Sequence, residues 1–182
     1  MAAVMDVLAL IGAALADAAF AFVACIGFAL ISNPPVKICL VAGVLAGLGH
    51  MTRFLLLDEG VGIGLGSLCG AILISLLSIP CARRWHTPAE LFSFPALLPM
   101  IPGMFAYKTI LATMQFLSAD RGPLREALLS DIFFNGLTTF FVMCGLVIGA
   151  IVPLFAFHRE SILVRTIWRK AHPNEEREAR MN

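Results

Sequence analysis

The feature that most constrains this chain is a series of apolar runs long enough to cross a lipid bilayer. A membrane-spanning helix requires about 20 consecutive, predominantly apolar residues. Runs of about this length or longer cover residues 4–31, 36–57, 61–79 and 128–157. Hydrophobic residues make up 59% of the chain and charged residues 14%, whereas soluble domains average about 45–50% and about 25%. The sequence therefore predicts an all-α polytopic membrane protein.

Another run, over residues 87–117, is interrupted by prolines and predicts a broken helix. The Thr-Pro-Ala-Glu pattern of residues 87–90 has the form of a capping box, with proline at the first helical position, and predicts a helix start. Pro95, Pro99 and Pro102 follow, and proline both removes a backbone donor and clashes with the preceding helical turn. We expect an unwound centre at residues 99–103, the P-x-x-P-G motif, followed by a second half-helix over residues 104–117. The total then comes to about five transmembrane helices, of which the fourth is broken.

An odd number of spans places the two ends of the chain on opposite sides of the membrane. If the N-terminus lies outside, Arg83, Arg84 and most other basic residues face the cytoplasm, while the acidic pair Asp58 and Glu59 faces outward. This distribution agrees with the positive-inside tendency of membrane proteins. We expect a multi-pass protein of the bacterial cell inner membrane with a periplasmic N-terminus. A transmembrane helical domain is predicted over residues 1–157 and a charged cytoplasmic tail over residues 158–182.

Glycines recur at every fourth residue within several of the predicted helices. This spacing lets helix backbones approach closely, which is how membrane helices associate without a hydrophobic driving force. The glycine faces predict either packing within one bundle or a contact with another subunit. The residues are Gly43, Gly47, Gly62, Gly66, Gly70, Gly145 and Gly149.

Asp17, His50 and Arg53 lie inside the first two predicted spans, whereas Asp6 is close enough to a helix end to reach water. Charged groups in a span are costly and mark either a transport pathway or a paired site. Asp17 lies near the middle of the first helix, where it could accept and release a proton or simply bond a neighbouring helix. His50 and Arg53 share one face of the second helix because they are three residues apart. That face could bind an anionic ligand, or Arg53 could extend to the interface and His50 could be a satisfied core residue.

The broken helix and the residues after it provide further candidates. Unwound backbone at membrane depth is tolerated where it lines a cavity or is buried in protein, and Pro99 and Pro102 lie in this segment. The amides from Gly103 to Phe105 would present a positive helix end to a substrate carboxylate, or the break could serve packing alone. Tyr107 and Lys108 follow one turn later. Asp131 and Asn135 of the last helix could pair with Lys108 structurally, or these residues could contact the ligand.

Several classes of function are disfavoured. The net charge of +1 provides no general attraction for nucleic acid. The five cysteines lack metal-type spacing, so we expect no metal site, no disulfide framework and no cofactor. The sequence contains no H-E-x-x-H or G-x-S-x-G motif, and the prediction is a protein that is not an enzyme.

Three stretches of the sequence resemble the threonine/serine exporter family. They are residues 27–37, residues 49–53, and residues 98–103 together with Tyr107, within a likeness that covers residues 5–157. The chain is most similar to the small, YjjB-type component of split members of this family. The resemblance implies that it works with a larger, YjjP-type membrane subunit, and that its substrates are small carboxylated metabolites such as threonine, serine or succinate. It also implies a role for residues that match the family pattern, namely Asp17, His50, Arg53, Pro99, Pro102, Gly103, Tyr107 and Asn135.

These observations lead to one favoured hypothesis and two alternatives. The favoured hypothesis is a proton-coupled secondary exporter, with Asp17 and Asp131 as coupling carboxylates. His50 and Arg53 would bind the anion beside the break. One alternative is a membrane scaffold that does not transport but stabilises or regulates the larger subunit. The other is a channel-like homo-oligomer with the broken helix as its filter.

Overall fold

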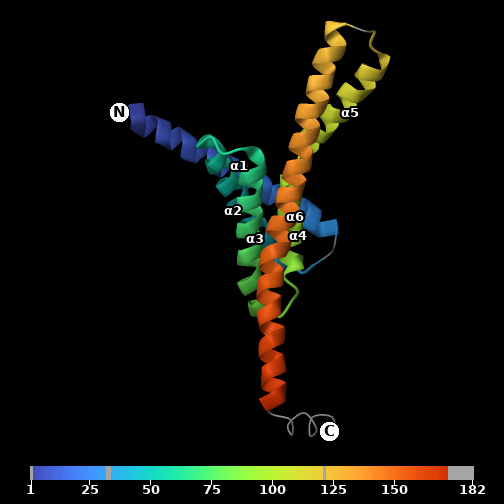
Figure 1. The fold of residues 1–182 in the computed structure, drawn as a ribbon. Helices are drawn as coiled ribbons and strands as arrows, with labels where there is room; N and C mark the ends of the chain where they lie inside the picture. The colour runs from blue at the N-terminus through green and yellow to red at the C-terminus, as the bar shows by residue number, and fades with distance from the viewer. Residues whose placement is uncertain (1, 32–33, 121, 172–182) are drawn as a thin grey trace.

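The computed structural model describes residues 2–31, 34–120 and 122–171, and these residues form helices and no strand. Figure 1 shows the arrangement of the helices. Their bounds are α1 Ala2–Ile31, α2 Val36–Asp58, α3 Ile63–Trp85, α4 Glu90–Leu97, the 3₁₀ helix η1 Leu98–Met100, α5 Gly103–Ser118 and α6 Pro123–Ala171. Four helices are long and apolar enough to cross a membrane, and the bent pair formed by residues 90–100 and 103–118 raises this number to five if it is one span. The predicted all-α membrane fold is confirmed.

Helix α3 continues beyond the point where the sequence predicted its end. It runs through Pro80 to Trp85, and His86 ends it in the left-handed conformation, with φ 54° and ψ 39°. Proline is tolerated inside membrane helices because neighbouring groups and local adjustments satisfy the backbone atom that it frees. The prediction that this helix ends at Pro80 is therefore wrong.

The start of the broken span also differs in detail from the prediction. Helix α4 begins at Glu90 after Ala89, which is itself in helical conformation, and no side chain caps the helix. The hydroxyl oxygen of Thr87 is buried without a hydrogen-bond partner among the described residues, so the predicted capping box does not form. The first turn is instead closed by main-chain bonds, including the one that the Ser93 amide donates to the Ala89 carbonyl.

The break itself lies where the prolines predicted it, and it is sharp. Pro95 remains inside α4, η1 follows, and α5 begins at Gly103 after a bend of 47°. Ile101 leaves the helical conformation with ψ 129°, because the residue before a proline is pushed toward extended geometry by the ring of Pro102. The predicted fourth span is thus two half-helices joined by a short non-helical link.

Helix α6 is continuous over its whole length, although it contains Pro153. The part of α6 that is apolar enough to cross a membrane lies within residues 123–156, and the helix itself starts five residues before the predicted Leu128. The helix passes the predicted boundary at residue 157 without interruption and ends at Ala171. The rest of the predicted tail, residues 172–182, lies outside the described residues. The division into a membrane domain and a cytoplasmic tail stays a prediction.

Glycines set the closest approaches between the helices, as their spacing predicted. A Cβ atom built on Gly47 would lie 3.1 Å from the Ala18 carbonyl oxygen, where α2 crosses α1. At the α2–α3 crossing, a Cβ on Gly70 would lie 2.8 Å from the Gly49 carbonyl oxygen. At the α3–α6 crossing, a Cβ on Gly145 would lie 2.9 Å from a main-chain oxygen of α3. The glycines therefore serve packing within the bundle, except Gly62, which has nothing within 4 Å.

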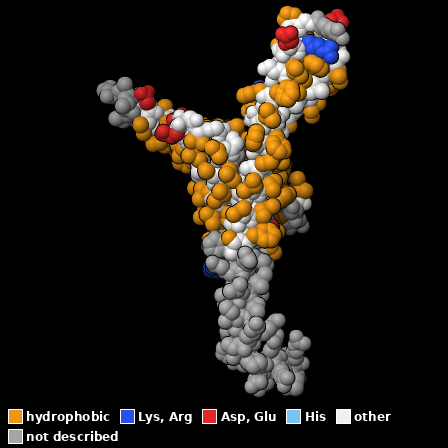
Figure 2. All heavy atoms as spheres, viewed as in Figure 1, with side chains coloured by type: hydrophobic (Ala, Val, Ile, Leu, Met, Phe, Trp, Pro, Cys, Tyr) orange, Lys and Arg blue, Asp and Glu red, His pale blue; other side chains and the backbone are white. Residues whose placement is uncertain are grey.

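The helices form a body and a projecting hairpin, which we call the arm. The body contains α1 to α4, η1 and the part of α6 that packs along α3. The arm consists of α5 and residues 123–140 of α6, and Figure 1 shows it extending away from the body beyond the α2–α3 turn. Apolar side chains cover the visible faces of both parts, and charges gather at the tip of the arm (Figure 2). This surface suits a lipid environment.

Candidate functional site

The site begins at the contact between α1 and α2. Because Gly47 lets the α2 backbone approach Ala18, the neighbouring Asp17 of α1 comes within reach of α2. The Nδ1 atom of His50, one turn after Gly47, lies 3.2 Å from the Oδ2 atom of Asp17. The His50 side chain is 12% exposed and that of Asp17 is 39% exposed. A close helix crossing without side chains between the backbones thus produces a carboxylate–imidazole pair in an apolar bundle.

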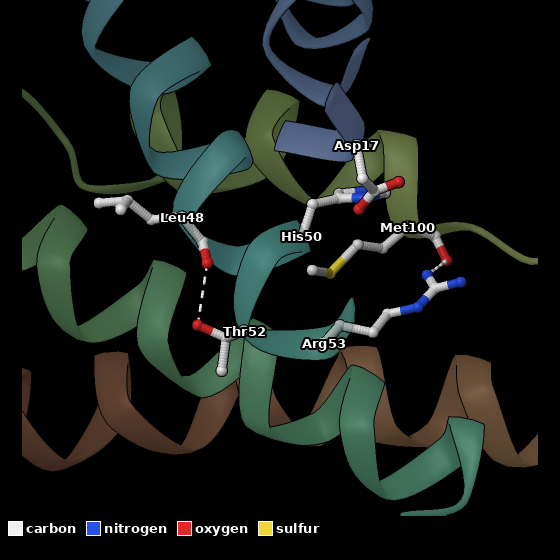
Figure 3. Close-up of polar contacts among 6 residues, drawn as sticks. All are labelled: Asp17, Leu48, His50, Thr52, Arg53 and Met100. Atoms are coloured by element: carbon white, nitrogen blue, oxygen red, sulfur yellow. Dashed lines mark hydrogen bonds and ion pairs between the residues drawn. The ribbon is translucent and has the colours of Figure 1, made fainter. Parts of the chain in front are cut away.

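Arg53 extends the site toward the broken helix. It lies three residues after His50 on the same face of α2, and its Nη1 atom donates a hydrogen bond of 3.4 Å to the Met100 carbonyl oxygen. Figure 3 shows the two α2 side chains reaching in the same direction, His50 toward Asp17 and Arg53 toward Met100. The site therefore joins α1, α2 and η1.

Met100 fixes the position of η1 on the body. Its side chain is fully buried, and its terminal methyl group lies over Gly70, where a Cβ would meet it at 2.7 Å. The same glycine contacts Gly49, so the 3₁₀ turn packs directly on the α2–α3 crossing. The carbonyl that Arg53 binds is thereby held in a defined place.

The break leaves main-chain groups that a continuous helix would satisfy internally. The Ile101 amide donates to the Leu98 carbonyl, while the Gly103 amide donates to the Ile101 carbonyl at 2.8 Å. The expectation that the amides from Gly103 to Phe105 are all free is therefore wrong for Gly103. Among the described residues, the amides of Met104 and Phe105 donate to no backbone carbonyl outside α5, as is usual for the first turn of a helix.

The cluster combines one carboxylate, one imidazole and one guanidinium group. If the His50 Nδ1 atom carries the proton, it donates to Asp17, and the second ring nitrogen is buried without a hydrogen-bond partner within the described residues. The guanidinium of Arg53 has five N–H donors, which suit bidentate recognition of a carboxylate. Its one described hydrogen bond is the one to Met100. The arrangement can hold an anion at Arg53 beside a pair of groups that can exchange a proton.

The structure brings together only part of the predicted site. Asp17, His50 and Arg53 meet beside η1, which contains Pro99, and Pro102 is buried just beyond it. The other predicted residues lie at the start of the arm or within it. These are Gly103, Tyr107, Lys108 and Asp131, which are exposed, and Asn135, which is buried.

The residues in the arm do not form the ion pair that the sequence allowed. The described side chains contain one ion pair, His50 with Asp17, so Lys108 and Asp131 are not paired with each other. The Asn135 side chain donates instead to the main-chain oxygen of Asp131, one turn earlier in its own helix, at 2.8 Å. These polar residues lie on the arm and do not belong to the cluster on the body.

Sequence reasoning missed Met100, and no sequence signal could have identified its role. The atom that binds Arg53 is a main-chain oxygen, which every residue type carries. Ser67 and Ser75 of α3 were also missed, and their hydroxyls are fully buried without partners among the described residues. A serine in an apolar run gives little signal because its hydroxyl can bond its own helix.

Comparisons with known proteins agree with the resemblance. The profile of a family described as "Threonine/Serine exporter, ThrE" matches residues 17–156. An uncharacterized protein of Haemophilus influenzae is 31% identical over 148 residues, which are 81% of this chain and 49% of that protein. This chain therefore spans about half the length of the curated relative that it matches. A comparison with solved structures finds no match. The family match includes Asp17, His50, Arg53 and the broken span, and the chain belongs to the threonine/serine exporter family.

Proposed function

We propose that this chain is the membrane component of a proton-coupled exporter of small carboxylated metabolites, such as threonine, serine or succinate. The observation that supports this function best is the cluster of Asp17, His50 and Arg53 against the broken span. Ionisable side chains in a membrane bundle are expensive to bury, and a broken helix beside them is typical of the substrate sites of secondary transporters.

The chemistry of the cluster suggests how substrate binding and proton coupling are divided among its residues. Arg53 would bind the substrate carboxylate in a bidentate manner, for which its single hydrogen bond to the Met100 carbonyl leaves other donors. Asp17 would take up and release the coupling proton, with His50 orienting its carboxylate. Substrate binding would then act directly on η1, because Arg53 holds this turn. Alternating access would follow from one bundle rocking against another.

A second membrane bundle is part of this proposal. The match covers about half of the relative from Haemophilus influenzae, so about half of that protein lies outside it. Here a separate, larger YjjP-type subunit would supply the corresponding part. The setting would be the bacterial inner membrane, with the N-terminus periplasmic and the C-terminus cytoplasmic.

Efflux from loaded cells tests the proposal. Cells preloaded with labelled threonine, serine or succinate would express this chain, the larger subunit, or both. We expect efflux only when both are present, and loss of efflux when the proton gradient is collapsed. A stable complex of both subunits that exports none of the three substrates would instead favour the scaffold function. Efflux by this chain alone would contradict the requirement for a second subunit.

One substitution tests the role of Asp17 within the same assay. Asp17→Asn keeps an oxygen that can accept from the His50 Nδ1 atom but removes the group that binds a proton. We expect at least a tenfold loss of gradient-driven efflux with unchanged amounts of protein in the membrane. Asp6→Asn is the matched control, because Asp6 is exposed near the start of the same helix. Efflux by Asp17→Asn at the level of this control would exclude Asp17 from the coupling step.

A further inference from the structure

The break in the fourth span frees a main-chain oxygen. In a continuous helix the Pro99 carbonyl would accept from the amide four residues later, that of Gly103, but this amide donates to the Ile101 carbonyl. A tighter 3₁₀ turn would need an amide on residue 102, which is a proline and has none. Among the described residues, no main-chain amide therefore donates to the Pro99 carbonyl, and its lone pairs are open to a side chain.

The ring of His50 lies beside this free carbonyl. Its Nδ1 atom is 3.2 Å from the Oδ2 atom of Asp17, whereas the other nitrogen, Nε2, is buried and has no hydrogen-bond partner within the described part of the chain. One turn further along α2, Arg53 donates to the next carbonyl, that of Met100, as Figure 3 shows. One face of α2 thus meets two successive oxygens of η1, and only one of them receives a hydrogen bond.

A neutral imidazole cannot satisfy both of its neighbours. It carries one hydrogen, so one ring nitrogen donates and the other accepts. With the hydrogen on Nδ1, His50 donates to the Asp17 carboxylate, but the lone pair of Nε2 faces the Pro99 oxygen. With the hydrogen on Nε2, the ring can donate to Pro99, but the lone pair of Nδ1 faces the carboxylate. In either tautomer two acceptors are opposite each other.

One additional proton on the Asp17–His50 pair removes this conflict. If the proton binds the imidazole, both ring nitrogens donate, one to the carboxylate and one to the carbonyl. If it binds Asp17, the carboxylic acid donates to Nδ1, and the ring carries its own hydrogen on Nε2. Whichever group holds the added proton, an N–H group then points at the broken span.

We propose that His50 is a positioning residue that latches η1 to α2 when the Asp17–His50 pair takes up a proton, through a hydrogen bond from Nε2 to the Pro99 carbonyl. Together with Arg53, α2 then holds two successive carbonyls, so that η1 cannot turn about a single contact. Loss of the proton leaves the Arg53 contact alone and frees η1 to move. This inference rests on the proposed function, because it takes the proton to be the coupling ion.

The described elements that pack against the ring bring no further charge to it. Helix α1 contributes Asp17, and α2 itself contributes Arg53. Helix α3 crosses α2 at this level with Gly70 and Ile74, and residues 91–100 of α4 and η1 contain no ionisable side chain. The response to pH at this place is therefore that of one carboxylate–imidazole pair beside one fixed positive charge.

Distances between spin labels test the latch without transport. The full chain, with its native cysteines replaced, would carry labels at Leu40→Cys on α2 and Ile101→Cys in the link, both of which are exposed positions. Leu40 lies about 15 Å before His50 along α2, which keeps the labels far enough apart for pulsed EPR. Lowering the pH from about 8 to about 5 covers the range in which histidine ordinarily titrates. In lipid nanodiscs without substrate, we expect a broad distance distribution at high pH to become one narrow population at low pH.

Two substitutions should abolish this response in opposite directions. His50→Asn can still donate to Asp17 but has no second donor for Pro99, so we expect the broad distribution at every pH. Asp17→Asn can donate to Nδ1 at every pH and so leaves the ring hydrogen on Nε2, and we expect the narrow population throughout. His86→Asn is the matched control: this histidine is exposed at the end of α3, asparagine suits its left-handed conformation, and the full response should remain.

Either of two results would overturn the proposal. One is a parent chain whose label distances do not change with pH. The other is a His50→Asn chain that responds to pH as the parent does. Where His50→Asn fails to accumulate, Asp17→Asn decides alone, and a normal pH response of that variant contradicts the latch. The measurement uses no substrate, so its failure leaves the exporter proposal intact, and absence of efflux leaves the latch intact.

Discussion

Arg53 meets the broken span through a main-chain oxygen, and this contact needs the shape of a guanidinium as well as its charge. Lysine carries one compact ammonium group, which cannot hold the Met100 carbonyl and a substrate carboxylate in the same fixed geometry. We expect Arg53→Lys to insert normally and to raise the substrate concentration for half-maximal efflux at least tenfold. Efflux titrations with both subunits present would measure this change.

Arg83→Lys is the matched control for this prediction. Arg83 is an exposed residue in the last turn of α3, outside the cluster, and its exchange should leave efflux unchanged. If Arg53→Lys transports like the wild type, a point charge on α2 is sufficient and the proposed bidentate recognition is wrong.

The crossing of α2 and α3 is the element that positions the broken span. Gly70 is in contact with the Gly49 backbone and with the Met100 methyl group at the same point. Gly70→Ala would place a Cβ 2.7 Å from that methyl and 2.8 Å from the Gly49 oxygen, so the two helices must separate. Overpacking of this kind costs about 1–3 kcal/mol. We expect a lower midpoint of thermal unfolding in detergent, together with impaired efflux because η1 moves away from Arg53.

Gly62→Ala provides the comparison, because Gly62 belongs to the same series of glycines spaced four residues apart. A Cβ at Gly62 has nothing within 4 Å, so this exchange should change the free energy of unfolding by less than about 0.5 kcal/mol. Equal effects of the two substitutions would mean that the α2–α3 contact is not close enough to control the break.

At the scale of the whole molecule, the bend of 47° leaves two topologies to distinguish. If α4 and α5 form one span, the tip of the arm lies on the opposite side of the membrane from the α3–α4 turn. If they form a re-entrant loop, both lie on the same side. The continuous course of α5 and α6 away from the body favours one broken span (Figure 1).

Thiol labelling decides between these topologies. In a chain whose native cysteines are replaced, Glu59→Cys and Asp120→Cys should react with an impermeant reagent from outside the cell. Arg84→Cys should react only after the membrane is opened. All three positions are exposed in the structure. Protection of Asp120→Cys in intact cells, with Glu59→Cys still labelled, would indicate a re-entrant loop. Labelling of Arg84→Cys alone would reverse the predicted orientation.

Much of the fold could be predicted because the bilayer limits the choices. In hydrocarbon every backbone group needs an internal partner, so a long apolar run must become a helix, which closely spaced prolines can interrupt. Residues 99–103 illustrate this, since the geometry of Pro102 and of the residue before it depends on local sterics alone. Helix ends were predicted less well, because Pro80 inside α3 and the uncapped start of α4 depend on neighbouring helices.

The sequence by itself determined which residues are anomalous in a membrane, namely Asp17, His50, Arg53 and the charges of the arm. This follows from the cost of burying a charge, which a residue carries wherever the chain places it. Only the tertiary structure decided which of them meet. Asp17 and His50 are distant in sequence and come together because two backbones cross at Gly47, whereas Lys108 and Asp131 stay apart. Contacts between helices depend on where the helices cross and on which main-chain oxygens lie there, and neither can be read from the amino-acid sequence.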